Sequence, residues 1–149
     1  MTAETQKGQK GLPATFIPKV CPVVLRTRNE EIQILAFRHP LAGSQIIKGT
    51  LEPDELPAAG ALRELFEESG IDHAVVLQKL GERSFDEIEQ HWHVLLCQPI
   101  QPLPENWSHY TTDGGGHTFE FFWHDLNSEP DESWHPIFQT ALAFIRDNI

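Results

Sequence analysis

Short apolar stretches separated by polar turns run through most of the chain and predict a series of β-strands. Residues 19–26 (KVCPVVLR) and 32–37 (IQILAF) are rich in β-branched and other apolar residues, with a polar turn between them. Pro22 indicates a sheet edge or a bulge, because proline donates no backbone hydrogen bond. The other predicted extended segments are residues 44–48, 74–85, 89–98 and 117–126.

Two other stretches predict helices. Residues 57–69 begin with proline, which suits the first turn of a helix, and end before Gly70, which suits its C-terminal cap. Leu56 is a poor N-cap, so Asp54 is the candidate cap. Residues 131–149 carry apolar side chains at helical spacing. The helix of residues 57–69 is predicted to bury the face formed by Ala58, Leu62, Leu65 and Phe66.

The segments between these elements read as irregular structure. Residues 99–107 are proline-rich, and residues 113–116 (DGGG) predict a mobile loop. The order of strands, helix, further strands and final helix predicts mixed α/β layers. A length of 149 residues suits one domain, which we place at residues 16–149 after a polar, flexible segment of residues 1–15.

Composition narrows the class of protein. The net charge of −11 argues against non-specific nucleic-acid binding, which needs basic patches. Apolar runs are too short to span a bilayer, and the first residues lack the apolar core of a secretion signal, so we expect no membrane partner and a cytoplasmic location. Cys21 and Cys97 lie in apolar stretches without metal-ligand spacing, which favours buried free thiols and leaves a disulfide open.

Three carboxylates share one face of the first predicted helix. Glu64, Glu67 and Glu68 stand at positions i, i+3 and i+4, so they repel one another unless a cation neutralises them. Oxygen ligands without sulfur or imidazole suit Mg²⁺ or Mn²⁺. A metal held there could bridge to an anionic phosphate substrate, so the pattern predicts metal-assisted displacement at phosphorus by water.

The residues around this cluster follow a specific spacing. Residues 49–71 (GTLEPDELPAAGALRELFEESGI) have the pattern G-x5-E-x7-R-E-U-x-E-E-x-G-U, with U an aliphatic residue. This segment resembles a complete Nudix box, the signature of enzymes that hydrolyse a nucleoside diphosphate linked to another moiety. The resemblance implies an α/β fold in which a mixed β-sheet is sandwiched between α-helices, with the box as a catalytic loop-helix-loop.

The resemblance also implies roles for individual residues. Glu55 and Arg63 match the pair that holds the loop against the catalytic helix. Glu64 and Glu68 match the principal metal ligands of the family. Glu67 matches a ligand that often acts through water or a second metal. The backbone carbonyl of Lys48 matches a further ligand. The general-base candidates are Glu64, Glu67, Asp113 and Glu120, and Glu120 is also a candidate metal ligand.

The sequence constrains the identity of the substrate less than it constrains the metal site. The pair Lys48–Gly49 resembles dinucleoside polyphosphate hydrolases, and a lysine there could reach an extra phosphate, so we favour nucleoside or dinucleoside polyphosphates bound by a monomer or homodimer. Nucleotide sugars and ADP-ribose are the alternatives. A non-catalytic nucleotide sensor and an isomerase like isopentenyl diphosphate isomerase are the rival functions. The isomerase would need a catalytic cysteine, for which Cys97 is the candidate.

Two histidines and several aromatic residues complete the set of candidates. His91 and His93 lie two residues apart on a predicted strand and so face the same way. The sequence shows no third ligand beside them, so a contact with substrate is favoured over a metal site. Aromatic residues that could stack on a nucleobase, or pack in the core, are Phe85, Trp92, Tyr110 and Trp123.

Overall fold

The first two strands form a tight hairpin in the computed structural model, which describes residues 15–149. β1 (Ile17–Arg28) and β2 (Glu31–His39) are joined by Asn29 and Glu30, whose φ angles of 52° and 67° suit the turns preferred in two-residue hairpins. The prediction that residues 1–15 are flexible lies outside the described residues, except at Thr15.

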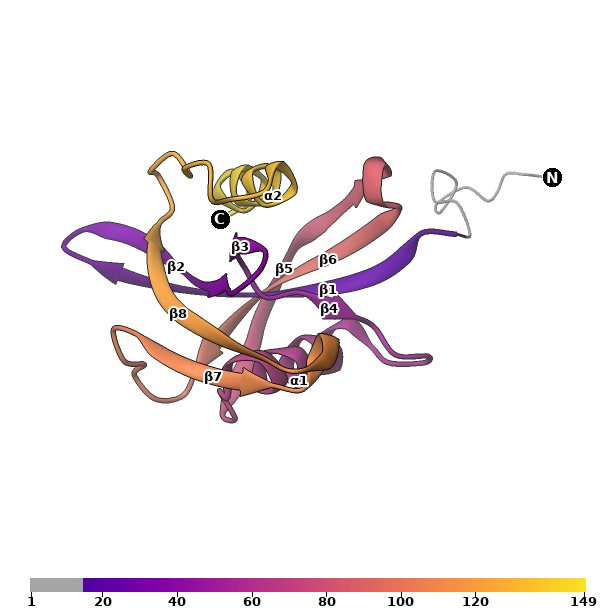
Figure 1. Cartoon of the computed structure of the whole chain (residues 1–149), viewed down its shortest axis with the longest axis horizontal. Helices are drawn as coiled ribbons and strands as arrows, with labels where there is room; N and C mark the ends of the chain where they lie inside the picture. The colour runs from indigo at the N-terminus through magenta and orange to yellow at the C-terminus, as the bar shows by residue number, and fades with distance from the viewer. Residues whose placement is uncertain (1–14) are drawn as a thin grey trace.

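The hairpin lies in the middle of an eight-stranded sheet with the order β5-β6-β1-β2-β8-β7 (Figure 1). β1 runs parallel to β6, and the other pairs in the sheet are antiparallel. β3 pairs with β2, and β4 pairs with β1. The further strands are β3 (Gly43–Gln45), β4 (Gly49–Thr50), β5 (Ala74–Phe85), β6 (Gln90–Pro99), β7 (Trp107–Thr111) and β8 (His117–Asp125).

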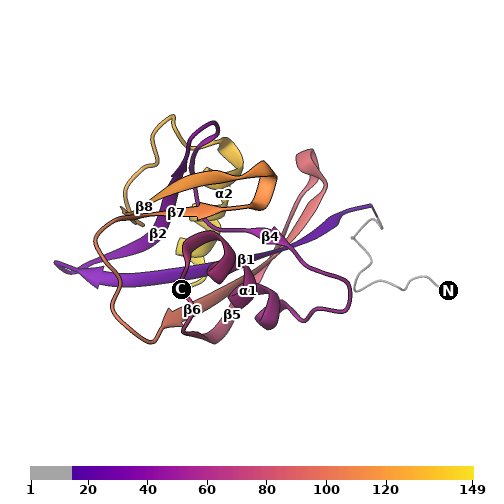
Figure 2. The same ribbon diagram turned by 60° about the horizontal axis from the view of Figure 1, so that its bottom comes forward.

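Two helices cover opposite faces of the sheet, as Figures 1 and 2 show. α1 (Pro57–Ser69) packs Ala61 and Leu65 into one hydrophobic cluster, and α2 (Pro136–Asp147) packs its apolar face, including Leu142 and Ile145, into the other. Alternate residues of β1 and β6 contribute to each cluster, because successive side chains of a strand point to opposite faces. The predicted α/β sandwich is confirmed.

The limits of the helices follow from local chemistry. α1 has the predicted limits, and Gly70 ends it at φ 83° while its N–H donates to the Phe66 carbonyl. The predicted cap by Asp54 is wrong, because Leu56 is the N-cap residue and no side chain bonds to the first turn there. α2 is shorter than predicted, since His135 accepts a hydrogen bond from the Ile137 N–H and Pro136 begins the helix.

The predicted buried face of α1 is correct only in part, since Leu65 is buried and Leu62 packs against the same cluster, but Ala58 is exposed. Phe66 is 53% exposed, whereas Glu64 and Glu68 are buried together with Ala61 and Leu65. The glutamates therefore face the interior, where the surrounding residues described below hold them. Helical spacing predicts burial for the apolar residues and does not indicate that two glutamates are buried.

The structure adds β7 to the predicted strands and places Pro22 at a local edge. Residues 107–111 form β7, a short edge strand on β8, although the sequence predicts irregular structure there. Pro22 lies on a central strand and pairs with Leu95 of β6. β1 pairs with β4 only at Lys19 and Val20 and with β2 only from Leu25 onward, so Pro22 occupies a local edge.

The cysteines and the helices bear on two further expectations. Cys21 and Cys97 are both buried free thiols, so no disulfide links them. Across residues 15–149, neither helix combines the length and the apolar character that crossing a membrane requires.

Candidate active site

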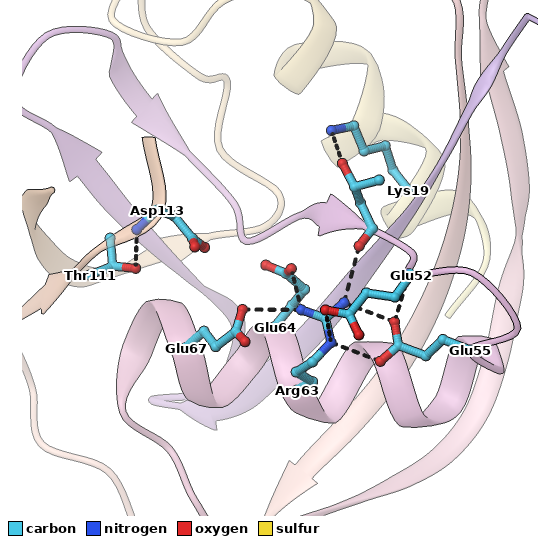
Figure 3. A network of polar contacts seen from close by, with 9 residues as sticks. Lys19, Glu52, Glu55, Arg63, Glu64, Glu67, Thr111 and Asp113 are labelled. Carbon is cyan, nitrogen blue, oxygen red and sulfur yellow. Dashed lines mark hydrogen bonds and ion pairs between the residues drawn. The ribbon is translucent and has the colours of Figure 1, made fainter. Parts of the chain in front are cut away.

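Arg63 ties the loop that precedes α1 to the helix itself (Figure 3). Its guanidinium donates to both carboxylate oxygens of Glu55, at 2.7 and 2.8 Å, and to the Thr50 carbonyl at 3.0 Å. The side chains of Arg63 and Glu55 are 22% and 13% exposed. Hydrogen bonds from Arg63 lower the pKa of Glu55 to about 2, so this carboxylate is charged at neutral pH.

The same guanidinium reaches the box carboxylates. Nη1 of Arg63 donates to Oε2 of Glu64 at 2.8 Å and to Oε1 of Glu67 at 3.1 Å. These bonds fix one oxygen of each glutamate and leave the other available. Arg63 is thus saturated by protein acceptors, which makes it a positioning residue.

The lack of a side chain at Gly49 leaves space for the Glu64 carboxylate. A Cβ atom at residue 49 would overlap the Glu64 carboxylate. Glu64 is only 5% exposed, and burial raises the pKa of its carboxyl while the Arg63 hydrogen bond opposes that rise. Oε1 of Glu64 is buried and has no hydrogen-bond partner within residues 15–149, an unfavourable state for a carboxylate oxygen that a cation would relieve.

Three carboxylates come together at Glu64. Glu64, Glu67 and Asp113 each offer an oxygen, and these oxygens lie within 4.8 Å of one another. Asp113 comes from the loop between β7 and β8 and faces α1 across the gap in Figure 3. An all-oxygen donor set with one orphaned buried oxygen fits a hard divalent cation such as Mg²⁺ or Mn²⁺.

Glu68 lies beside this cluster and is also buried. It is 8% exposed, and burial together with the charges of Glu64 and Asp113 raises its pKa to about 8. A divalent cation nearby would favour its charged form.

An open cavity of about 640 Å³ adjoins the cluster and carries two lysines. Lys19 Nζ donates to Thr50 Oγ1 at 2.7 Å, and Lys48 Nζ lies 5.6 Å from the ring centre of Trp92. Burial lowers the pKa of both lysines, while Glu64 and Glu68 act in the opposite direction. The cavity lining is Lys19, Lys48, Gly49, Thr50, Leu51, Glu52, Pro53, Arg63, Glu64, Glu67, Glu68, Asp113 and Gly114.

This geometry agrees with a family match over most of the chain. Residues 17–141 match the family model described as the NUDIX domain. The chain belongs to the Nudix family. It is a Nudix-type hydrolase, in a family that acts on small nucleotide substrates and generally uses divalent metals. No curated protein sequence matches the chain.

Solved structures share the Nudix fold at low sequence identity. A MutT protein from Methanosarcina mazei Go1 is 21% identical, with 92% of this chain and 98% of that chain aligned at a TM-score of 0.63. An Ap4A hydrolase from C. elegans is 16% identical over 89% and 97% of the two chains, at 0.64. An ADP-ribose pyrophosphatase from Streptococcus suis is 13% identical over 89% and 92%, at 0.58.

Not all predicted site residues of this Nudix domain reach the cavity. Glu120 lies on the β8 face opposite to Phe119 and Phe121, which pack on the α1 side, and its carboxylate accepts a hydrogen bond from Ser108. The structure therefore gives no support to Glu120 as a metal ligand and points to Asp113 as the downstream carboxylate. His91 and His93 are also absent from the cavity lining.

The four aromatic residues that could stack on a nucleobase lie away from the cavity. Phe85 and Trp92 are buried in the core on the α2 side of the sheet, so they pack the interior. Tyr110 is 63% exposed, and Trp123 donates to the Pro104 carbonyl beneath the Arg26 guanidinium. None of the four lines the cavity.

Cys97 does not sit in the cleft that the isomerase would require. It is buried in the cluster beneath α1, and burial raises the pKa of its thiol to about 12.

Sequence reasoning also missed Lys19, since a lysine at a strand end carries no signal until β4 brings Thr50 beside it.

Proposed function

We propose that this Nudix hydrolase cleaves a phosphoanhydride bond in a nucleoside diphosphate linked to another moiety, with Mg²⁺ or Mn²⁺ as cofactor. The observation that carries this proposal is the convergence of the Glu64, Glu67 and Asp113 carboxylates, together with Oε1 of Glu64, which is buried and has no hydrogen-bond partner among the described residues. When bound, a divalent cation polarises the phosphoryl oxygens and offsets the charge that develops on them.

The protein's own groups have distinct tasks in this scheme. Glu64 and Asp113, with Glu68 and the Lys48 carbonyl beside them, would hold the cation, and Glu67 would have a separate task. Glu55 and Arg63 keep the loop and the helix in register, so that the carboxylates converge.

Glu67 is our candidate for the general base. Its side chain is 38% exposed, compared with 7% for that of Glu64, so water reaches it more easily. Arg63 holds Oε1 of Glu67 and leaves Oε2 to accept the proton of the attacking water.

Lys19 and Lys48 would bind the phosphate chain of the substrate. Both line the cavity, and the Lys19 ammonium group donates to Thr50 Oγ1 beside the carboxylate cluster. Two lysines favour a substrate with several phosphates, so we favour nucleoside or dinucleoside polyphosphates. The likeness to an Ap4A hydrolase agrees with this choice, and the likeness to an ADP-ribose pyrophosphatase keeps ADP-ribose and nucleotide sugars as the second candidates.

A substrate panel tests the proposal. Nucleoside triphosphates, dinucleoside polyphosphates, ADP-ribose and nucleotide sugars are incubated with the full chain and Mg²⁺, and the products are separated by chromatography. Glu64→Gln and Lys48→Ala are compared with Glu132→Gln, an exposed site away from the cavity.

Each result has a defined meaning. We expect turnover of polyphosphates, at least about 100-fold loss with Glu64→Gln, and a higher KM with Lys48→Ala. Turnover of ADP-ribose or nucleotide sugars alone would replace the substrate class and retain the chemistry. Tight binding without turnover of any compound would overturn the hydrolase proposal in favour of a sensor.

A further inference from the structure

The hairpin of β5 and β6 brings two histidines and a carboxylate together outside the cavity. The register pairs Glu82 with His93 and Ser84 with His91 across the antiparallel strands. Paired residues and residues two apart on a strand share a face, so these side chains project from the same side of the sheet. That side also carries Leu95 and Cys97 of β6, which pack beneath α1.

Glu82 stands between the two imidazoles. Its Oε1 lies 2.7 Å from His91 Nε2, and its Oε2 lies 3.7 Å from His93 Nδ1. The imidazole rings are 5.2 Å apart and nearly perpendicular. One ligand atom from each of the three residues lies within 4.8 Å of the others, so a single ion could contact all three after small side-chain adjustments.

The hydrogen bonds around the histidines suit a ligand role. Nδ1 of His93 is buried and has no hydrogen-bond partner in the part of the chain that the structure describes, although Glu82 is close to it. Nδ1 of His91 lies 2.8 Å from Ser84 Oγ, which leaves Nε2 directed at Glu82. Metal-binding histidines characteristically have the second ring nitrogen held in this way, which fixes the ring orientation.

We propose that Glu82, His91 and His93 bind a divalent transition-metal ion, for which zinc is the first candidate. Two imidazoles and one carboxylate match the donor types of zinc sites, whereas Mg²⁺ prefers oxygen ligands alone. Three protein ligands leave a fourth position for water, and the site is open to solvent because Glu82 is 40% exposed. No ligand is shared with the carboxylate cluster, so this site is independent of the proposed function.

Lys79 is the cation that now neutralises Glu82. Its ammonium group contacts Oε2 of the same carboxylate, and its side chain is 43% exposed. A divalent ion would compete with this ammonium group, which can move into solvent. The competition limits the affinity of the site without blocking the histidine nitrogens.

Calorimetric titration with ZnCl₂ tests the site directly. The full chain is stripped of metal with a chelator and titrated in excess Mg²⁺, which keeps the carboxylate cluster occupied. We expect one zinc ion per chain and at least about 100-fold weaker binding for His91→Ala and His93→Ala, because loss of a ligand should cost no less than loss of an outer-shell partner. Ser84→Ala should weaken binding about 10-fold. His73→Ala, at a histidine whose side chain is 74% exposed, is the matched control and should not change it.

Co²⁺ provides a second measurement that reports geometry. The visible spectrum of bound Co²⁺ should show the intense bands of a four-coordinate site, and His93→Gln should abolish them while circular dichroism confirms folding. Absence of a zinc ion in the wild type would overturn the proposal, as would unchanged affinity in both histidine variants. Loss of zinc in Glu64→Gln with retention in His93→Ala would assign the ion to the carboxylate cluster instead.

Discussion

Gly49 lies so close to Glu64 that a side chain on residue 49 would occupy the position of the Glu64 carboxylate. Gly49→Ala should therefore displace this carboxylate while it keeps the charges of the cluster. We expect kcat/KM to fall about 100-fold, since misplacement of a catalytic group by about 1 Å has effects of that size. Steady-state kinetics with Mg²⁺ measure the change, and a thermal unfolding curve establishes that the variant folds. Full activity in a folded Gly49→Ala protein would contradict the role assigned to Glu64.

The Glu55–Arg63 pair should stabilise the fold more than a comparable pair at the surface. Glu105 also accepts hydrogen bonds from an arginine, Arg26, but its side chain is 57% exposed, compared with 13% for Glu55. We expect Glu55→Gln to lower the free energy of unfolding by about 1–3 kcal/mol, because the Arg63 guanidinium loses a charged acceptor in a partly buried site. Glu105→Gln should have a much smaller effect, and urea unfolding compares the two.

Acid should remove the contribution of Glu55. The pKa of Glu55 is lowered from 4.5 to about 2 in the folded protein, so the unfolded chain binds the proton more readily. The stabilisation is complete well above pH 4.5 and is lost as the pH falls from about 4.5 toward 2. Wild type and Glu55→Gln should therefore converge in stability over that range. A stability difference that stays constant down to pH 2 would show that the ion pair is not its source.

The buried thiols should be inert in the native protein. Burial raises the pKa of both Cys21 and Cys97 to about 12, and the thiolate is the reactive form. A chromogenic thiol reagent at pH 8 should titrate no cysteine in the folded chain and two after denaturation. Cys97→Ala should retain hydrolase activity. Rapid labelling of the native protein, or loss of all activity in Cys97→Ala, would support the isomerase alternative.

Asp113 and Glu120 can be separated by matched substitutions. Asp113 joins the carboxylate cluster, whereas Glu120 lies on the other face of β8 and bonds to Ser108. Asp113→Asn should raise the Mg²⁺ concentration needed for half-maximal activity about 10-fold or more, and Glu120→Gln should leave it unchanged. The reverse result would restore Glu120 as the downstream ligand.

Local signals allowed much of this structure to be predicted. Pro57 and Gly70 mark the limits of α1, because each restricts or permits backbone conformations at its own position. The box carboxylates lie on one helical face because residues three and four positions apart are neighbours on a helix. The Glu55–Arg63 ion pair also followed from the box pattern and is present.

Tertiary contacts decided what the sequence could not show. Glu64 and Glu68 are buried because Gly49 and Arg63 accommodate them, which no periodicity indicates. Glu82 was missed because its position opposite His93 depends on the register of β5 on β6, which shifts between Val76 and Gln78 and again between Lys79 and Gly81.

The central claim is that the carboxylates around Glu64 bind a divalent metal, and Mn²⁺ binding tests it most directly. Electron paramagnetic resonance measures free Mn²⁺ during titration of the wild type, Glu64→Gln and Glu132→Gln. The wild type and Glu132→Gln should bind Mn²⁺ with the same affinity, and Glu64→Gln should bind it at least about 10-fold more weakly. Equal affinity in all three proteins would contradict the account.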